Sequence, residues 1–576
     1  MSKHKFPGRK PRIPLEPPKS VQKPAQTPGG QSRLPSAAAV RETIESIVIA
    51  FVLAFLFRAF EAEAFVIPTG SMAPTLMGRH KDLACPKCSY PYQAGASEEV
   101  DENEVLRGAA WRVAACTCPM CRYTYVIDVN RAGRSTEPSY SGDRIIVDKL
   151  AYEFQQPQRW DVVVFRYPNV AWKNYIKRLV GLPGEKVRIQ YGDIWVQRGD
   201  EDFRLVRKPP RKLLAMLQPV FDNDYMPHIA RHGWPERWTP DGSAPEAGVG
   251  WRSEDKASFS IAAQDRSEHW LRYHHRVPSF EQWRRREENP RQPIDVPASL
   301  ITDFTAYDTS RTQAALDNFQ PGPEQFGLHW VGDLALECTV ESHSPQGTLI
   351  LELCKGGREF QCRFDLTAGK AELRISGAEM SDWRPAAVTP LGCPGRHELR
   401  FANCDNELLL WVDEKLVSFD APTTYPELNN RLPKQSDLAP AGVGVVGAAL
   451  TVSHLRLKRD IYYIAMDYKR RKENRPISDY EWSLFFNRQN IEELPWGKQP
   501  AQSAEFSLGE DQFLMLGDNS ANSLDGRLWG PEHWVKRELL IGKALFIYWP
   551  HSWHKIPYIN IPCPYFPNFA RMGLVR

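Results

Sequence analysis

The sequence lacks a strong excess of either charge. Its 576 residues hold 73 Lys and Arg against 70 Asp and Glu, a formal net charge of +3. This balance gives no global electrostatic reason to expect nucleic acid as a partner. Hydrophobic residues make up 42% and charged residues 25%, which excludes a disordered polymer and a polytopic membrane protein. At about 100–200 residues per domain, the length predicts several folding units.

Long hydrophobic runs are also scarce. The run Ser46–Phe57 is shorter than the roughly 20 apolar residues that a helix needs to cross a bilayer, so a span would require all of residues 37–60. Residues 1–36 carry eight Lys or Arg, eight Pro and one acid, which predicts a disordered basic tail on the cytoplasmic side. We expect 37–60 to be a retained transmembrane anchor. The alternatives are a buried core helix and a secretory signal cleaved after Ala62-Glu63-Ala64.

A complete disulfide framework is not expected, because the eleven cysteines are an odd number. Two Cys-x-x-Cys pairs, with 29 residues between them, can each offer two thiolates to one tetrahedral ion. They predict a zinc-ribbon-like module over residues 80–141 that holds a structural zinc. Its ligands would be Cys85, Cys88, Cys118 and Cys121. Disulfides or free thiols are the alternatives, and Cys116 could replace Cys118.

The sequence after Asp143 has features typical of β-strands. Apolar segments at 144–147, 161–165 and 175–180 are each bounded by Pro or Gly signals and predict one sheet system. Residues 201–324 show no clear alternation and predict an irregular insertion. Residues 325–460 alternate strongly, which predicts an antiparallel β-sandwich that resembles laminin-G or concanavalin-like folds. Such a sandwich can bind a glycan or a protein; a structural spacer is the alternative.

Four motifs follow one another along the chain. They are FVIPTGSMAPTL at 65–76, GDRIIVDK at 142–149, YIKRLVGLPGEKV at 175–187 and GDNSANSLDGRLWG at 517–530. Together they resemble bacterial type I signal peptidases (leader peptidases), the membrane-anchored serine proteases that remove signal peptides from exported proteins. The resemblance covers residues 40–79, 142–198 and 505–550, about a quarter of the chain.

The resemblance implies a mainly β protein at the inner or plasma membrane. Residues 61–79, 142–200 and 461–576 would form an all-β catalytic domain on the exported face. One N-terminal helix would precede that domain in the membrane, and the N-terminus would be cytoplasmic. The remaining residues look inserted.

The chemistry is expected to need a serine and a lysine. A serine hydroxyl is a weak nucleophile until a base takes its proton, and lysine can be that base where burial lowers its pKa. Lys177 shares one strand face with Tyr175 and Leu179, which predicts an apolar setting. By resemblance Ser71 is the nucleophile, Lys177 the general base and Thr69 a donor to the oxyanion, where many relatives carry Ser.

Further roles rest on the resemblance. Ser523 falls where the family places a serine that orients the lysine, and Asp518, Asp525 and Arg527 fall at supporting polar positions. Ser520 departs from the pattern, since many relatives carry Arg there, which weakens the expectation of a surface salt bridge.

Shallow apolar pockets for small substrate side chains are also implied. Their expected wall residues are Phe65, Ile67 and Ile176, with ordinary β-core as the alternative role.

These inferences predict a single-pass membrane serine endopeptidase with no cofactor for catalysis. Its partners would be signal peptides of exported preproteins and membrane lipid, and no nucleic acid. The alternative is a membrane-tethered binding or scaffold protein, in which the sandwich and the zinc ribbon hold a partner and the protease core is vestigial.

Overall fold

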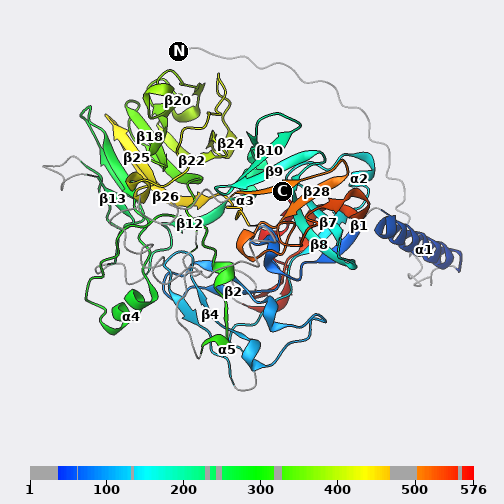
Figure 1. Cartoon of the computed structure of the whole chain (residues 1–576). Helices are drawn as coiled ribbons and strands as arrows, with labels where there is room; N and C mark the ends of the chain where they lie inside the picture. The colour runs from blue at the N-terminus through cyan, green and yellow to red at the C-terminus, as the bar shows by residue number, and fades with distance from the viewer. Residues whose placement is uncertain are drawn as a thin grey trace, which may run out of the picture. The chain divides into compact units, whose positions relative to one another are not determined.

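The computed structural model describes residues 37–60, 62–130, 135–227, 234–241, 250–316, 327, 329–392, 394–466, 503–555 and 561–576 (Figure 1). The predicted disordered tail at 1–36 lies outside the described residues. The chain divides into two compact units, residues 1–59 and 60–576.

Helix α1 (Ala37–Phe60) covers the residues of the predicted anchor. In its first turns the Arg41 Nε donates to Glu45 Oε1 at 2.7 Å, an exposed pair one turn apart. The side chains of residues 53–60 lie outside the description. Among the residues that the structure describes, no helix is both long and apolar enough to cross a membrane.

An eight-stranded antiparallel sheet carries the motif residues. Its order is β1-β6-β30-β7-β8-β28-β29, and β33 pairs with β30. The strands are β1 (Ala62–Val66), β6 (Arg144–Asp148), β7 (Val162–Tyr167), β8 (Val170–Gly181), β28 (Gln512–Leu516), β29 (Val535–Lys536), β30 (Leu540–Trp549) and β33 (Gly573–Leu574). Along β7, Val162 and Val164 join one buried cluster while Val163 and Phe165 join another, so both faces of the sheet are covered. The predicted strands at 144–147, 161–165 and 175–180 are confirmed as β6, β7 and part of β8.

A four-stranded sheet combines strands from before and after the long insertion. Its order is β11-β10-β9-β27. Its strands are β9 (Glu185–Gln190), β10 (Asp193–Arg198), β11 (Arg204–Leu205) and β27 (Ser503–Ser507). Because β27 pairs with β9, the chain re-enters the same sheet after the insertion.

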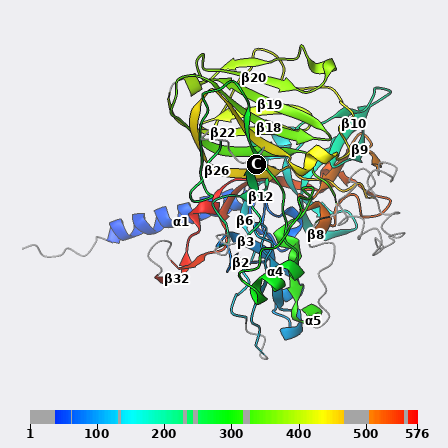
Figure 2. The ribbon, with the colours of Figure 1, turned by 90° about the vertical axis from the view of Figure 1, so that its left-hand side faces the viewer.

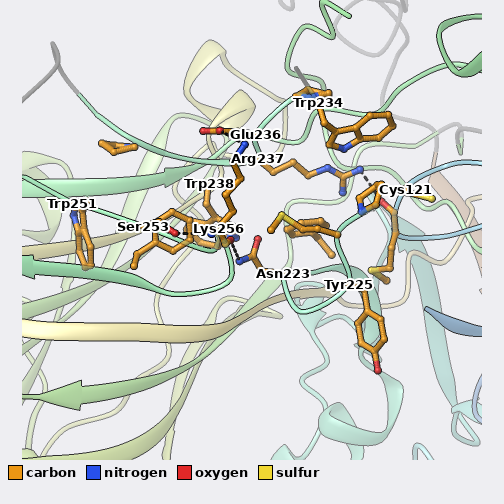
Figure 3. A pocket seen from close by; sticks show the side chains of 17 residues that line it. Cys121, Asn223, Tyr225, Trp234, Glu236, Arg237, Trp238, Trp251, Ser253 and Lys256 are labelled. Carbon is orange, nitrogen blue, oxygen red and sulfur yellow. Dashed lines mark hydrogen bonds and ion pairs between the residues drawn. The ribbon is translucent and has the colours of Figure 1, made fainter. Parts of the chain in front are cut away.

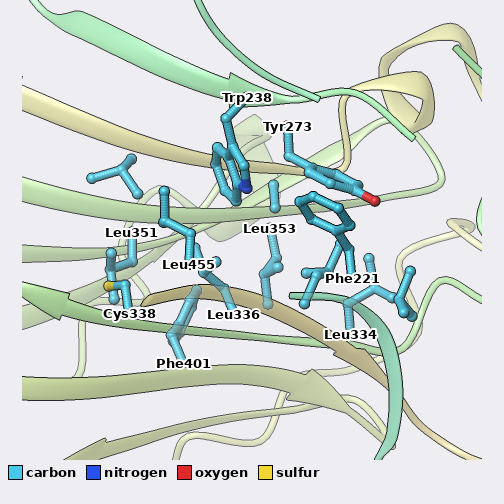
Figure 4. Close-up of a cluster of buried hydrophobic side chains, with 14 of the residues drawn as sticks. Phe221, Trp238, Tyr273, Leu334, Leu336, Cys338, Leu351, Leu353, Phe401 and Leu455 are labelled. Carbon is cyan, nitrogen blue, oxygen red and sulfur yellow. The ribbon is translucent and has the colours of Figure 1, made fainter. Parts of the chain in front are cut away.

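The predicted sandwich consists of two seven-stranded antiparallel sheets (Figure 1; Figure 2). The first contains β12 (Gln218–Asp222), β26 (Ala449–Arg459), β17 (Leu334–Ser342), β22 (Gly395–Cys404), β23 (Glu407–Val412), β24 (Lys415–Leu416) and β14 (Phe259–Ala262). The second contains β13 (Trp238–Pro240), β15 (His269–Tyr273), β25 (Ala441–Val446), β18 (Thr348–Lys355), β19 (Arg358–Asp365), β20 (Lys370–Ile375) and β21 (Ala386–Val388). Apolar side chains of both sheets meet between them, among them Leu336, Leu353 and Phe401 (Figure 4).

The sandwich is larger than predicted, because four of its strands come from residues 201–324. Strand β12 pairs with β26, and β15 pairs with β25. Phe221, Trp238 and Tyr273 from this region enter the sandwich core (Figure 4). The region is therefore not an irregular insertion throughout. Its strands of three to five residues are too short to show alternation, and pairing with distant strands decides their conformation.

Two hairpins make up the cysteine module. Strand β2 (His80–Ala84) pairs with β3 (Pro91–Gly95), and β4 (Val113–Thr117) pairs with β5 (Thr124–Val126). The short β16 (Arg311–Thr312), far along the chain, adds to the edge of β4. The remaining elements are α2 (Ala151–Phe154), α3 (Pro210–Met216), α4 (Phe280–Glu288), α5 (Gln313–Leu316), β31 (Trp553–Lys555) and β32 (Pro562–Phe566).

Candidate active site

Ser71 lies in a single 3-10 turn, Gly70–Met72, that follows β1. Thr69 before the turn is extended (φ −120°, ψ 158°), and the Ala73 N–H closes the turn on the Gly70 carbonyl at 3.0 Å. Gly70 is required by a close approach, since a Cβ there would lie 2.0 Å from the Tyr307 ring. The turn holds the Ser71 side chain in a buried position, 8% exposed.

Lys177 reaches Ser71 from the middle of the sheet. It lies on β8, between β7 and β28, and is 4% exposed. Its Nζ donates to Ser71 Oγ at 2.6 Å and to the Ile176 carbonyl at 3.0 Å, and stands 5.3 Å from the centroid of the Tyr175 ring. The two predicted dyad residues are therefore in direct contact in an enclosed setting.

Burial sets the charge state of the lysine. It lowers the pKa of Lys177 from 10.5 to about 8, although the carboxylates of Asp525 and Asp518 favour the charged form. A substantial fraction of Lys177 is therefore neutral near pH 8, which a general base requires.

Asp518 forms a fully buried ion pair with Arg178, the residue after the lysine. Arg178 Nε and Nη2 donate to the two carboxylate oxygens at 2.7 and 2.6 Å. Thr75 Oγ also donates to Asp518, at 2.6 Å. The carboxylate thus ties the loop that carries Ser71 to strand β8, and charge-assisted bonds of this kind are the stronger ones.

Asp525 and Arg527 close the loop of the last motif. Arg527 donates through Nε and Nη2 to Asp525, both at 2.8 Å, and the Gly517 N–H donates to the same carboxylate at 3.0 Å. Arg527 also donates to the Ser520 carbonyl at 2.9 Å. Both side chains are buried, so the pair positions the loop from inside.

Ser523 is brought close to the dyad. It is 4% exposed, and a Cβ added at Gly517 would lie 2.1 Å from Ser523 Oγ and 2.4 Å from the Ser71 carbonyl oxygen. Among the described residues its hydroxyl has no hydrogen-bond partner. A bond from Ser523 to Lys177 therefore stays a prediction.

The other predicted residues lie around the same turn. Thr69 is exposed, and its side chain makes no capping bond to the turn. Ile67, Ile176 and the half-buried Phe65 pack in one apolar cluster with Met72, the residue after Ser71. The structure brings the three expected wall residues together beside the serine.

Sequence reasoning missed a second support of the turn. The Asn519 N–H donates to the Ser71 carbonyl at 3.1 Å, and Asn519 Nδ2 donates to the Gly70 carbonyl at 3.2 Å and to Asp308 Oδ1 at 2.7 Å. The neighbouring Tyr307 hydroxyl donates to the Arg79 carbonyl at 3.1 Å. Burial raises the pKa of Asp308 to about 6. Asn519 stands within a quoted motif, whereas no sequence signal marks residues 307 and 308.

The four predicted metal ligands converge. Cys85 Sγ lies 3.5 Å from Cys121 Sγ, Cys88 Sγ lies 3.6 Å from Cys118 Sγ, and all four are buried. Sulfurs bound at about 2.3 Å to a tetrahedral zinc are about 3.8 Å apart, so these residues fit that ion. Cys116 is not part of the set, since its sulfur lies 3.3 Å from the Tyr92 hydroxyl.

A cavity of about 190 Å³ borders this module (Figure 3). Met120 and Cys121 line it from the module, and Trp234, Trp238 and Trp251 line it from the sandwich side. The predicted glycan or protein ligand of the sandwich would find aromatic faces there.

A buried serine hydroxyl held by a lysine of lowered pKa defines a site for nucleophilic attack on a carbonyl group. The family "Signal peptidase, peptidase S26" matches the chain at residues 105–216 and 443–549. The two matched segments make up less than half of the chain. They include Lys177, Asp518, Ser523, Asp525 and Arg527, whereas Ser71 lies before them.

Curated relatives agree with the family. A probable signal peptidase I-2 of Synechocystis sp. is 36% identical over 121 residues, 20% of this chain and 55% of the relative. A signal peptidase I of Leptolyngbya laminosa is 27% identical over 195 residues, 32% and 64% of the two chains. One of Pseudomonas fluorescens is 58% identical over 43 residues, 8% and 15%. The chain thus spans less than two thirds of the length of these relatives.

Solved structures give only distant likenesses. A carbohydrate-binding module CBM66 of Bacillus subtilis covers 22% of this chain and 75% of its own, with 12% identity and a TM-score of 0.17. A Bacillus licheniformis β-glucanase covers 39% and 92%, with 8% identity and a TM-score of 0.22.

Proposed function

We propose that the chain is a membrane-bound serine endopeptidase that removes N-terminal signal peptides from exported preproteins. The contact that carries the proposal is the 2.6 Å hydrogen bond between Lys177 Nζ and Ser71 Oγ. The similarity of part of the chain to the signal peptidase family and to curated signal peptidases supports it.

The chemistry uses the neutral form of the lysine. Lys177 Nζ takes the proton of Ser71 Oγ as the hydroxyl attacks the scissile carbonyl carbon, and then gives that proton to the leaving amine. A water deprotonated by Lys177 hydrolyses the acyl-enzyme and restores both residues. The Ser71 N–H and the Thr69 hydroxyl stabilise the oxyanion in this scheme, and Ser523 orients the lysine.

Substrate choice follows from the apolar wall. Phe65, Ile67 and Ile176 lie in one cluster beside the serine. We assign them to shallow pockets that accept small substrate side chains one and three residues before the cleaved bond. Larger substrate side chains would clash with these apolar wall residues.

Placement at the cell membrane is part of the proposal. Helix α1 is the retained anchor, with the basic tail in the cytoplasm and the catalytic domain on the exported face. The mature protein should keep its N-terminal tail and stay with membranes through an alkaline wash. A mature N-terminus at Phe65 would contradict the anchor.

The four cysteines would hold one structural zinc that takes no part in the reaction. Zinc bound by four thiolates has no open position for substrate or water. Its contribution is to the folding of the two hairpins.

Cleavage of a preprotein by purified full-length variants tests the function. Ser71→Ala and Lys177→Arg should each lose about 10³-fold or more in kcat/KM, and the double variant should be little worse, because the two residues act as a unit. Arg fails because its guanidinium does not lose a proton at working pH. Lys186→Arg, on the exposed part of β9, is the matched control. An inactive wild type would favour the vestigial-protease alternative, and substantial turnover by Lys177→Arg would contradict Lys177 as the general base.

A further inference from the structure

A second cluster of ligand-type side chains lies apart from the dyad and from the four cysteines. His80 and Asp82 are two residues apart on β2, so they share one strand face, and His551 follows the end of β30. His80 Nε2 lies 3.2 Å from His551 Nδ1 and 3.8 Å from Asp82 Oδ1, and His551 Nε2 contacts Asp82 Oδ2. His80 is fully buried and His551 nearly so.

Hydrogen bonding fixes where His80 carries its proton. Its Nδ1 lies 2.6 Å from the Gly78 carbonyl oxygen. A carbonyl oxygen can only accept, so Nδ1 bears the hydrogen and Nε2 presents a lone pair. That lone pair points at His551.

No neutral form of His551 satisfies both of its neighbours. If its single N–H donates to His80, its other nitrogen turns a lone pair toward the Asp82 carboxylate. If the N–H donates to Asp82, two imidazole lone pairs face each other across 3.2 Å. Each arrangement opposes two electron pairs, and a cation held between them would remove this repulsion.

We propose that a divalent transition metal, zinc in the first place, is bound here by one atom each of His80, Asp82 and His551, since a ligand atom from each of the three lies within 4.8 Å of the others. Two imidazole nitrogens and one carboxylate oxygen are a donor set that zinc prefers. Nitrogens bound at about 2.0–2.1 Å to a tetrahedral ion are about 3.3 Å apart, which matches the observed 3.2 Å. The bond from His80 to the Gly78 carbonyl is the outer contact that typically orients a metal-bound histidine.

The surroundings suit such an ion. The Asp82 side chain is 30% exposed, which leaves a path to solvent and a position for a water ligand. The Tyr140 ring stacks on His551 with centroids 5.1 Å apart. The ion would join β2 to the segment after β30, next to Gly78, which packs against the Thr69 backbone.

Metal content of the full-length protein, purified in detergent and loaded with zinc, tests the site. The wild type should hold about one ion more than His551→Ala or Asp82→Asn. His454→Ala is the matched control, because His454 pairs with Asp224 on the exposed surface. With Co²⁺ the ion that His551→Ala loses should lack thiolate charge-transfer absorption, which belongs to the cysteine site alone.

Equal metal content in the wild type and His551→Ala, with both folded by circular dichroism, would overturn the proposal. If His551→Ala does not fold, Asp82→Asn still tests the site, because it removes a ligand and keeps the size of the side chain.

Discussion

Lys177 makes the activity depend on pH. Burial holds its pKa at about 8, so below pH 7 nearly all of it is protonated and cannot accept a proton from Ser71. We expect kcat/KM for a short peptide to rise about tenfold per pH unit up to pH 7 and to level off above pH 8. Rates from pH 6 to 10, with chemistry rate-limiting, measure this. A flat profile would exclude a lysine base.

The same burial costs stability. The folded pKa lies below the unfolded value of 10.5, so the unfolded chain binds more protons and stability rises with pH between about 8 and 10.5. At pH 7 the lowered pKa of Lys177 costs about 3 kcal/mol of folding free energy. Removing its hydrogen bond to Ser71 would cost about 1 kcal/mol of stability. Lys177→Met should therefore be more stable at pH 7 by about 2 kcal/mol, measured by denaturant unfolding. The gain should vanish near pH 10.

The proximity of site residues could be predicted where a motif is continuous. Ser71, Lys177, Asp518 and Asp525 stand inside quoted motifs, and the structure brings them together. Asp308 could not be found, because its contact with Asn519 spans 211 positions and depends on how an insertion folds. No local pattern contains that information.

At the scale of elements, the segment 306–312 supports the serine turn from outside the peptidase-like segments. Asp308 accepts from Asn519, which in turn donates to the carbonyls of Gly70 and Ser71. Asp308→Ala removes this acceptor. We expect a fall in kcat of about tenfold with little change in KM, because the turn that aims Ser71 loses a fixed neighbour.

Asp308→Asn is the informative control. Its amide oxygen can still accept from Asn519, so most of the activity should return. Because the folded pKa of Asp308, about 6, lies above the ordinary value of 3.8, stability falls as the pH rises from 3.8 to about 6, and Asn removes that loss. An Asn variant as impaired as the Ala variant would show that the charge, and not the hydrogen bond, matters.

Strands with clean alternation were predictable, and short paired ones were not. Leu336, Val340 and Leu353 mark β17 and β18, and both form as expected. Strands β12 to β15 were not predicted, because the conformation of a strand of three to five residues depends on the strand with which it pairs. The helix at 37–60 forms over the predicted residues.

At the scale of the whole molecule, the sandwich and the cysteine module are not independent parts. One buried cluster runs from Phe221 and Leu336 of the sandwich to Cys118 and Ile127 of the cysteine module. The Thr117 N–H on β4 donates to Thr309 Oγ at 2.8 Å. Domain boundaries read along the sequence therefore separate residues that share one core.

This continuity links the cysteine site to the nucleophile. Strand β4 leads to Cys118 and pairs with β16, and the residues just before β16 include Tyr307, whose ring lies against Gly70. Losing the zinc should unfold the two hairpins and loosen the serine turn. We expect Cys88→Ala to lower kcat about as much as Asp308→Ala does, while the pH profile keeps its midpoint near 8, because Lys177 stays buried in the sheet. Adding Cys88→Ala to Asp308→Ala should then cost little more. A much larger loss than in Asp308→Ala would show that the module supports the turn through more than Tyr307 and Asp308, and full activity would show that the module is uncoupled from the turn.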